Sequence, residues 1–295
     1  MTVDMLFLQI VSGLSEGMVV FLCAMGLTLI LGSLRVLNVS HGSVYMIGAY
    51  FVVAGNAAVQ ALPGHFYIAL ILSTIGAAIF GGIVEILVIR PLYKLEHIFQ
   101  FITTFGVTFV VMDLVKIVWG GSYYTINVPA YLQGPIMFYD FIIPKYNIAL
   151  IVFGIVLFIG MHFLIHRSRL GLLIRGITVD RMMMSLFGID VARLYSVVFM
   201  IGCALAGLGG ALIAPISAAG PGIDVTVLIK CFVVIVIGGF GSIGGALLAS
   251  MIVGLVNSFG ILLIPKAAMG FAFFVMVVTL IFRPWGLLGK PIRLD

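Results

Sequence analysis

Charged residues are scarce in this sequence, since Asp, Glu, Lys and Arg together make up 8% of its 295 residues. Soluble domains have about a quarter of their residues charged, so a water-soluble globular domain is excluded. No charged residue occurs between Arg35 and Glu85, or from Leu194 to Ile223. Each run is longer than the ~20 apolar residues that cross a bilayer. The first run predicts two membrane crossings, and the second predicts one crossing with a loop.

Other absences narrow the class further. The apolar runs do not alternate with polar residues, which argues against a β-barrel. No basic residue precedes the first apolar stretch, so we expect a retained helix there and not a secretory signal. Cys23, Cys203 and Cys231 lie in apolar segments without CxxC spacing, so neither a zinc site nor a disulfide is expected. No HExxH or GxxxxGK[ST] motif is found, so we expect no catalytic residue and no enzyme.

Hydrophobic residues account for 63% of the sequence. They predict an all-α, polytopic transmembrane helical bundle, with about 8–9 spans and broken helices, in a single domain over residues 1–295. Gly and Pro residues mark the breaks between spans. The expected crossings are 6–31, 43–60, 66–89, 97–119, 144–166, 191–214, 223–240, 246–264 and 267–282.

Basic residues are distributed unevenly between the two sides that these crossings define. Eleven of the 15 fall on one side: Arg35, Arg90, Lys94, Arg167, Arg169, Arg175, Arg181, Arg193, Arg283, Lys290 and Arg293. By the positive-inside rule this side is cytoplasmic, which predicts an outside N-terminus and a cytoplasmic C-terminus. The net charge of +5 is thus a topology signal, and no nucleic-acid partner is implied.

Small residues recur at helical spacing within the apolar spans. The series are Gly13 and Gly17; Gly202, Ala206 and Gly210; and Gly238, Ser242, Ala246, Ser250, Gly254 and Ser258. In lipid such ridges let helix backbones approach closely, so we interpret them as packing surfaces rather than substrate sites.

Two polar, glycine-bearing breaks interrupt the apolar sequence. One contains Asn38, Ser40, His41 and Gly42, and the other contains Gly239, Gly241 and Ser242. Unwound backbone at membrane depth is tolerated only where protein or a water-filled cavity satisfies it, so these residues are candidates for a substrate pathway. A cytoplasmic turn is the alternative for each break.

Ionisable residues inside the spans are few, and each is costly unless it has a partner or faces a cavity. Asp113 with Lys116, and Glu85 with Arg90, are spaced to form structural pairs. Lys230 has no acidic residue three or four positions away, so its side chain either extends outward or faces a polar pathway. His162 and His166 share a helix face without further ligands, so a metal site is not expected.

The longest cytoplasmic stretch, Arg167 to Arg193, is basic but contains an apolar core around Met183, Met184 and Phe187. Adaptable methionines suit docking to a cytoplasmic partner. Lying on the membrane lipid surface is the competing interpretation.

Several ordered motifs together carry a family resemblance. They are Gly26 to Gly32, Arg35 to Gly42, Met46 to Tyr50, Arg90-Pro91, Ser168 to Gly171, Ser185 to Ile189, Gly238 to Ala246 and Arg283 to Gly289. In these motifs the sequence resembles permease subunits of branched-chain amino acid ABC importers, of the LivH type in the LivH/LivM permease family. The resemblance extends over essentially the whole chain.

The resemblance implies a role in translocating amino acids across the bacterial inner membrane. It implies a second related permease of the LivM type, two cytoplasmic ATPase subunits that bind ATP and Mg, and a periplasmic solute-binding protein. It assigns residues 175–188 to a cytoplasmic coupling helix, with Arg175, Asp180, Met183, Met184, Ser185, Phe187 and Gly188 facing the ATPase. Gly176, Val179 and Met184 depart from the family pattern, as does Asn38 to Gly42, which could alter the substrate. No cofactor is expected in this chain.

Alternatives remain at this stage. The same permease class handles urea, amides and aromatic carboxylates. An ion-coupled secondary transporter would normally place carboxylates at the bilayer midplane, where this sequence has almost none. A membrane-embedded enzyme would need a clustered nucleophile, base or metal set, which the motifs do not supply.

Overall fold

The computed structural model describes residues 3–138 and 141–289, and it confirms a bundle of long helices. Every predicted crossing coincides with one long helix. Seven helical segments in the described residues are long and apolar enough to cross a membrane, and α2 and α9 are outside that set. The helices are α1 (Val3–Leu34), α2 (His41–Ala58), α3 (His65–Val84), α4 (His97–Trp119), α5 (Lys145–Arg167), α8 (Val191–Ile213), α9 (Ile223–Gly238), α10 (Ile243–Leu263) and α11 (Ala268–Phe282).

Short elements connect these helices. A π-turn η1 (Glu85–Ile89) and a 3-10 turn η2 (Arg90–Lys94) extend α3, and η3 (Ala130–Leu132) and η4 (Pro265–Ala267) lie in later links. Strands β1 (Pro135–Phe138) and β2 (Phe141–Pro144) pair in antiparallel register, with Pro135 opposite Pro144. Helices α6 (Arg169–Val179) and α7 (Arg181–Leu186) join α5 to α8.

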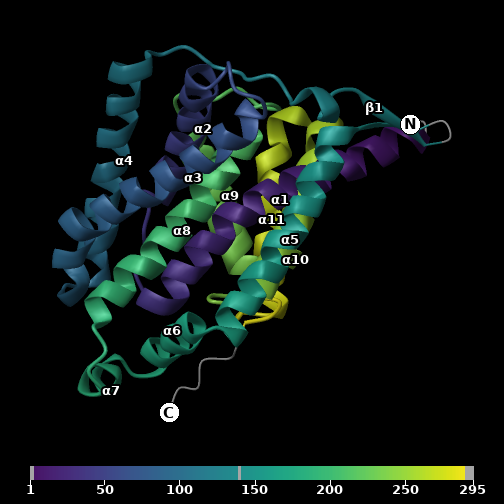
Figure 1. Ribbon diagram of the computed structural model, residues 1–295. Helices are drawn as coiled ribbons and strands as arrows, with labels where there is room; N and C mark the ends of the chain where they lie inside the picture. Colours follow the sequence, from purple (N-terminus) through teal and green to yellow (C-terminus); the bar gives the residue numbers. More distant parts are fainter. Residues whose placement is uncertain (1–2, 139–140, 290–295) are drawn as a thin grey trace.

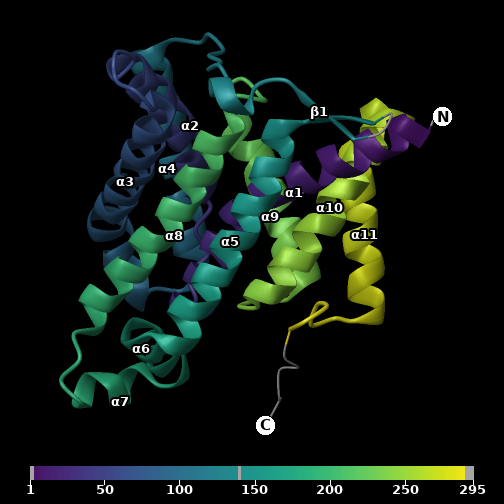
Figure 2. The ribbon, with the colours of Figure 1, turned by 45° about the vertical axis from the view of Figure 1, so that its right-hand side comes forward.

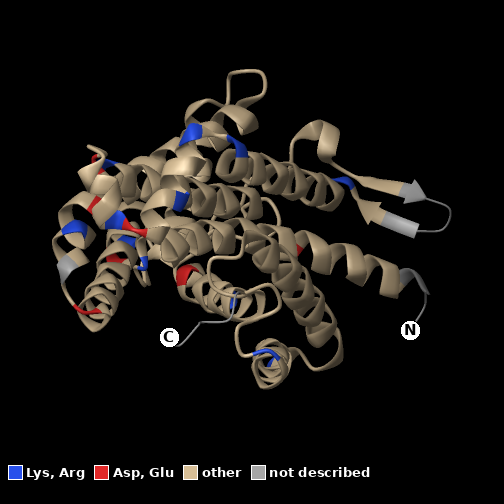
Figure 3. Ribbon diagram, turned by 90° about the horizontal axis from the view of Figure 1, so that it is seen from below, with Lys and Arg blue, Asp and Glu red and all other residues tan. Residues whose placement is uncertain are grey.

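The two ends of the bundle differ in what they carry. Helices α6 and α7 lie at one end, here called the α6–α7 end, and β1 lies at the other, here called the hairpin end (Figures 1 and 2). Figure 3, seen from below Figure 1, shows charged residues in small groups between long stretches that carry none. The described arginines that the sequence assigns to one side follow α1, α3 and α11, end α5 or lie in α6 to α8, all at the α6–α7 end. Lys290 and Arg293 are outside the described residues.

Glycine ridges hold the central helices together. The Gly13 and Gly17 positions of α1 face Ser258, Gly254 and the Ser250 backbone of α10 so closely that a side chain would overlap them. Gly26 contacts Gly202 and Gly48 contacts Gly207 in the same way. The prediction that these series pack helices is therefore confirmed.

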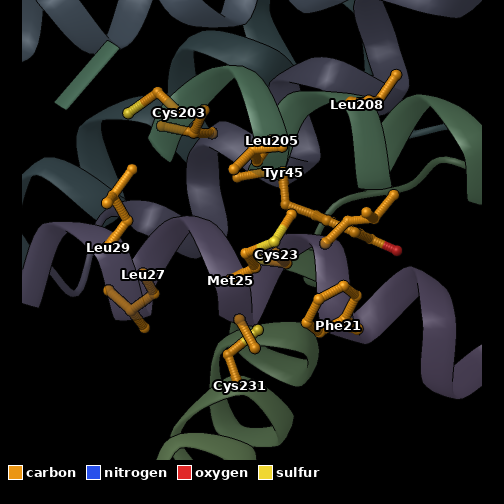
Figure 4. Close-up of a cluster of buried hydrophobic side chains, with 14 of the residues drawn as sticks. Phe21, Cys23, Met25, Leu27, Leu29, Tyr45, Cys203, Leu205, Leu208 and Cys231 are labelled. Atoms are coloured by element: carbon orange, nitrogen blue, oxygen red, sulfur yellow. The ribbon is translucent and has the colours of Figure 1, made fainter. Parts of the chain in front are cut away.

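The apolar core surrounds α1, whose residues from Met18 to Ile30 are almost all buried. Figure 4 shows Cys231 of α9 beside Phe21, Cys23 and Met25 of α1. All three cysteines are free thiols with no exposed surface. They act as small packing side chains, as the sequence predicts.

Two predicted ion pairs are confirmed. Lys116 Nζ lies 3.2 Å from Asp113 Oδ1 on exposed α4, and Arg90 Nη2 lies 3.0 Å from the buried Glu85 carboxylate.

The rings of His162 and His166 stack on each other with centroids 4.2 Å apart. His166 Nδ1 is also 2.9 Å from the backbone oxygen of His162, so this nitrogen is engaged within the helix.

Candidate functional site

A cavity of about 560 Å³ lies between α1, α9 and α10 in the described structure. Its wall begins at the hairpin end, at Tyr123, Asn147 and the link from Ile213 to Ile223, and it continues inward to Lys230. This size falls in the range of about 300–1,000 Å³ that small-molecule sites occupy. Apolar side chains form much of the wall: Val19, Val20, Ile213, Ile216, Ile223, Val227 and Ile261.

A polar cluster from three helices lies on this wall. Lys230 Nζ of α9 donates to Glu16 Oε1 of α1 at 2.5 Å. Asn257 Nδ2 of α10 donates to both oxygens of the Glu16 carboxylate, at 2.8 and 3.0 Å. The side chains of Lys230 and Glu16 are 19% and 29% exposed. The Lys230 ammonium therefore faces the cavity. Of the two orientations that the sequence left open, outward or toward a polar pathway, the structure has the second.

Desolvation explains why these residues associate. A lone charge inside an apolar span costs about 2.5–3.5 kcal/mol, and pairing with hydrogen bonds to a third group reduces that cost.

Glu16 and Asn257 were not assigned to the pathway from the sequence, because they lie 214 and 241 residues from their partners in this cluster. The sequence distinguishes Glu16 and Asn257 only as strongly polar residues within apolar spans.

The break from Asn38 to Gly42 is buried inside the bundle. His41 Nε2 lies 3.0 Å from the Cys23 backbone oxygen in the middle of α1, and Ser40 Oγ donates to Asn38 Oδ1 at 2.6 Å. The backbone N–H of Val39 donates to Thr104 Oγ1 of α4 at 3.2 Å. Asn38 and His41 have no exposed surface. The segment is therefore protein-enclosed backbone and not a surface turn, although it is not part of the cavity wall.

The second break lies at the α6–α7 end, away from the cavity. Ser242 Oγ accepts from the Gly245 N–H and caps α10, while Gly239 and Gly241 have positive φ angles of 96° and 77°. The segment from Trp285 to Gly289 packs against it. Leu287 N–H donates to the Ile237 carbonyl at 2.7 Å, and Leu288 N–H donates to the Gly238 carbonyl at 3.1 Å.

The stretch from Arg175 to Gly188 comprises the end of α6 and all of α7. Asp180 caps α7, because its Oδ1 accepts from the N–H groups of Met182 and Met183 at 2.8 and 3.0 Å. Met184 packs against Gly176, and Arg175 donates to the Ile165 carbonyl. Gly188 follows α7 with a φ of 78°, and its N–H donates to the Ser185 carbonyl. The two helices are thus fixed to each other and to α5.

Apolar side chains of this stretch point away from the bundle. Phe187 is 79% exposed, and four others are more than half exposed: Val179, Met182, Met183 and Leu186. Beside them a second cavity of about 550 Å³ is lined by residues of α1, α4, α6 and α7 and the turn between α3 and α4, including Arg35, His97, Asp180 and Arg181. An exposed apolar group rimmed by charges is typical of a protein interaction surface.

Comparison with known proteins gives one family. Residues 9–280 match the family described as branched-chain amino acid transport system / permease component. The chain is 31% identical to the high-affinity branched-chain amino acid transport system permease protein BraD of Pseudomonas aeruginosa, over 96% of this chain and 95% of that protein. It is 27% identical to LivH of Escherichia coli K12 over the same shares, and 25% identical to a probable LivH of Methanocaldococcus jannaschii over 93% and 91%. No solved structure matches the chain.

Proposed function

The chain belongs to the family of branched-chain amino acid transport system permease components, and we propose from this that it is the transmembrane subunit of an ATP-driven amino acid importer. The match of residues 9–280, nearly the whole bundle, is the observation that carries the proposal. The multi-pass architecture supports it, because a permease must offer a path through the bilayer that a solute can follow.

Branched-chain amino acids are the proposed solutes. The BraD and LivH relatives are named for this substrate class. In this chain, support comes from the cavity, where several Val and Ile side chains lie beside the charged pair of Glu16 and Lys230. An apolar wall next to opposite charges suits a solute with an apolar side chain and a polar head.

The proposed partners are a second permease of the LivM type, two cytoplasmic ATPase subunits and a periplasmic binding protein. The exposed apolar side chains around Met183 and Phe187 support docking of an ATPase at α6 and α7. ATP and Mg would be bound by those partners. In this scheme, closure of the ATPase pair moves α6 and α7 and reorients the two permeases between outward and inward states.

The proposed location is the bacterial inner membrane, with the α6–α7 end in the cytoplasm and the hairpin end outside. Support comes from the arginines at the α6–α7 end, since cytoplasmic segments of membrane proteins are enriched in basic residues. Lys230 is proposed as a pathway residue, and its position on the cavity wall supports this. The breaks containing Asn38, Ser40, His41 and Gly42, and Gly239, Gly241 and Ser242, are proposed as pathway or hinge segments that change surroundings during the cycle.

Uptake in cells tests the proposal. Deleting the gene in its host is expected to abolish ATP-dependent uptake of labelled leucine, isoleucine and valine, and the wild-type gene is expected to restore it. Urea, a short amide and benzoate, tested in parallel, separate the solutes of this permease class. Phe187→Asp is expected to abolish uptake while Phe187→Tyr preserves it, with membrane levels of both variants checked by immunoblotting. Undiminished amino acid uptake after deletion would contradict the proposed function.

A further inference from the structure

The charged cluster of Glu16, Lys230 and Asn257 has unused binding capacity. Among the described residues the partner of the Lys230 ammonium is Glu16, so one of its three N–H donors is occupied by protein. In the described part of the chain, the one donor to Glu16 Oε2 is Asn257. The side chains of Glu16 and Lys230 are also partly exposed, and both residues line the cavity. Each can therefore form a further charge-assisted hydrogen bond without first giving up the one that stabilises it.

The charges of the cavity wall cancel. Of the residues that line it in the described structure, Glu16 is the acidic one and Lys230 is the basic one. A solute with a net charge would bring a like charge next to one of the two groups, which disfavours binding in a partly desolvated site. A solute that carries both a cation and an anion a few ångströms apart satisfies both groups together.

The remainder of the cavity is suited to an apolar group. Val19, Val20 and Val227 flank the charged cluster on α1 and α9. Ile213 at the end of α8 and Ile216 in the link to α9 also line the cavity. Burying an aliphatic side chain there is favourable by the hydrophobic effect, independently of the charges. The polar and apolar parts of one small solute therefore each have a complementary surface.

We infer that Glu16 and Lys230 bind the α-ammonium and α-carboxylate groups of a zwitterionic amino acid, with Asn257 orienting the Glu16 carboxylate and the aliphatic wall receiving the side chain. This inference rests on the proposed function and assigns the binding residues that the function requires. Glu16 accepts from the ammonium and Lys230 donates to the carboxylate. No covalent bond changes.

Direct binding to the purified full-length chain in lipid nanodiscs tests the inference. Labelled leucine is expected to bind saturably. Unlabelled leucine is expected to compete, whereas leucinamide, which lacks the carboxylate, and 4-methylpentanoate, which lacks the ammonium, are not. Glu16→Gln and Lys230→Met are each expected to weaken leucine binding by about 10- to 100-fold, because each removes a charge-assisted hydrogen bond. Lys266→Met, in the exposed turn η4, serves as the matched control and is expected to bind as the wild type does.

A folding defect is separated from a binding defect by the double variant Glu16→Gln with Lys230→Met. It leaves no unpaired charge, so we expect a wild-type unfolding temperature together with lost binding. Wild-type affinity in folded variants, equal competition by leucinamide, or no saturable binding by the wild type would each overturn the inference. If cells carrying these variants still import leucine at the wild-type rate, the assigned residues are wrong while the importer function stands. If the wild-type chain supports no amino acid uptake, the function itself fails.

Discussion

The carboxylate of Glu85 and the guanidinium of Arg90 lie 3.0 Å apart where α3 ends, and the carboxylate is fully buried while the Arg90 side chain is 37% exposed. Tyr93 and Ser196 hydroxyls, each 2.8 Å away, also donate to this carboxylate. The pair therefore connects α3 to α8 through a single buried anion.

This asymmetry in burial predicts unequal effects of mutation. Arg90→Gln leaves the buried carboxylate without its cation and is expected to lower the free energy of unfolding by about 3–5 kcal/mol. Glu85→Gln is expected to cost about 1–3 kcal/mol, because the remaining arginine can reach solvent. Denaturant unfolding in detergent measures both. Arg193→Gln, in an exposed pair with Asp190, is the control and should change stability by less than about 1 kcal/mol. Equal losses for Arg90→Gln and Glu85→Gln would contradict the assignment.

Gly48→Ala is expected to destabilise the protein, because a side chain at this position of α2 overlaps the Gly207 backbone of α8. Forcing the helices apart should cost about 1–3 kcal/mol. Gly106→Ala in α4 is the matched control, since nothing lies within 4 Å of that position. The shift in unfolding temperature relative to the wild type should therefore differ between the two purified variants in sign or size. A similar shift for both would show that helix propensity, and not contact between α2 and α8, sets the effect.

Asp180→Ala is expected to loosen α7, because it removes the side-chain oxygen that accepts from two N–H groups of the first turn. Loss of such a cap costs about 1 kcal/mol. If α7 transmits motion from the ATPase, leucine uptake should fall several-fold at unchanged membrane levels. Asp180→Asn retains an accepting oxygen and should restore most of the uptake. Should the Asn variant be as impaired as the Ala variant, the charge and not the cap would be the relevant property.

Accessibility to water-soluble thiol reagents should distinguish the two kinds of pathway residue. Lys230→Cys is expected to react in resting membranes, since it replaces a cavity-wall residue. Asn38→Cys and His41→Cys are expected to react only while ATP drives the cycle, because both positions are fully buried in the structure. The native thiols Cys23, Cys203 and Cys231 are fully buried as well, so background labelling should be low. If Asn38→Cys and His41→Cys never react, the break between α1 and α2 is a packing element throughout.

The membrane crossings could be predicted from the sequence because bilayer thickness fixes the length of each apolar run. The boundaries of α4 and α8 agree with the expected spans to within one residue at each end. The hairpin formed by β1 and β2 was not predicted. Its strands are four residues each, which is too short for a periodic signal in the sequence.

The candidate site could be predicted only in part. Lys230 was recognisable as a cation with no partner on its own helix, but its partner Glu16 depends on how α1 packs against α9. The break at Asn38 was recognisable from its polar residues. Whether it was a surface turn or buried backbone depended on Cys23 and Thr104, which come from other helices. Sequence patterns report local periodicity, and these contacts are set by tertiary packing.

The hydrogen bonds that Leu287 and Leu288 make to the last turn of α9 also limit where the chain can be shortened or joined to a tag. Removing the tail beyond Phe282 would uncover two carbonyl oxygens at the start of the loop that reverses the chain into α10. A bulky fusion joined close to Gly289 would press on the same place, because Gly239 lies against it without room for a side chain. Affinity labels and fluorescent reporters therefore belong at the opposite terminus or after a long spacer.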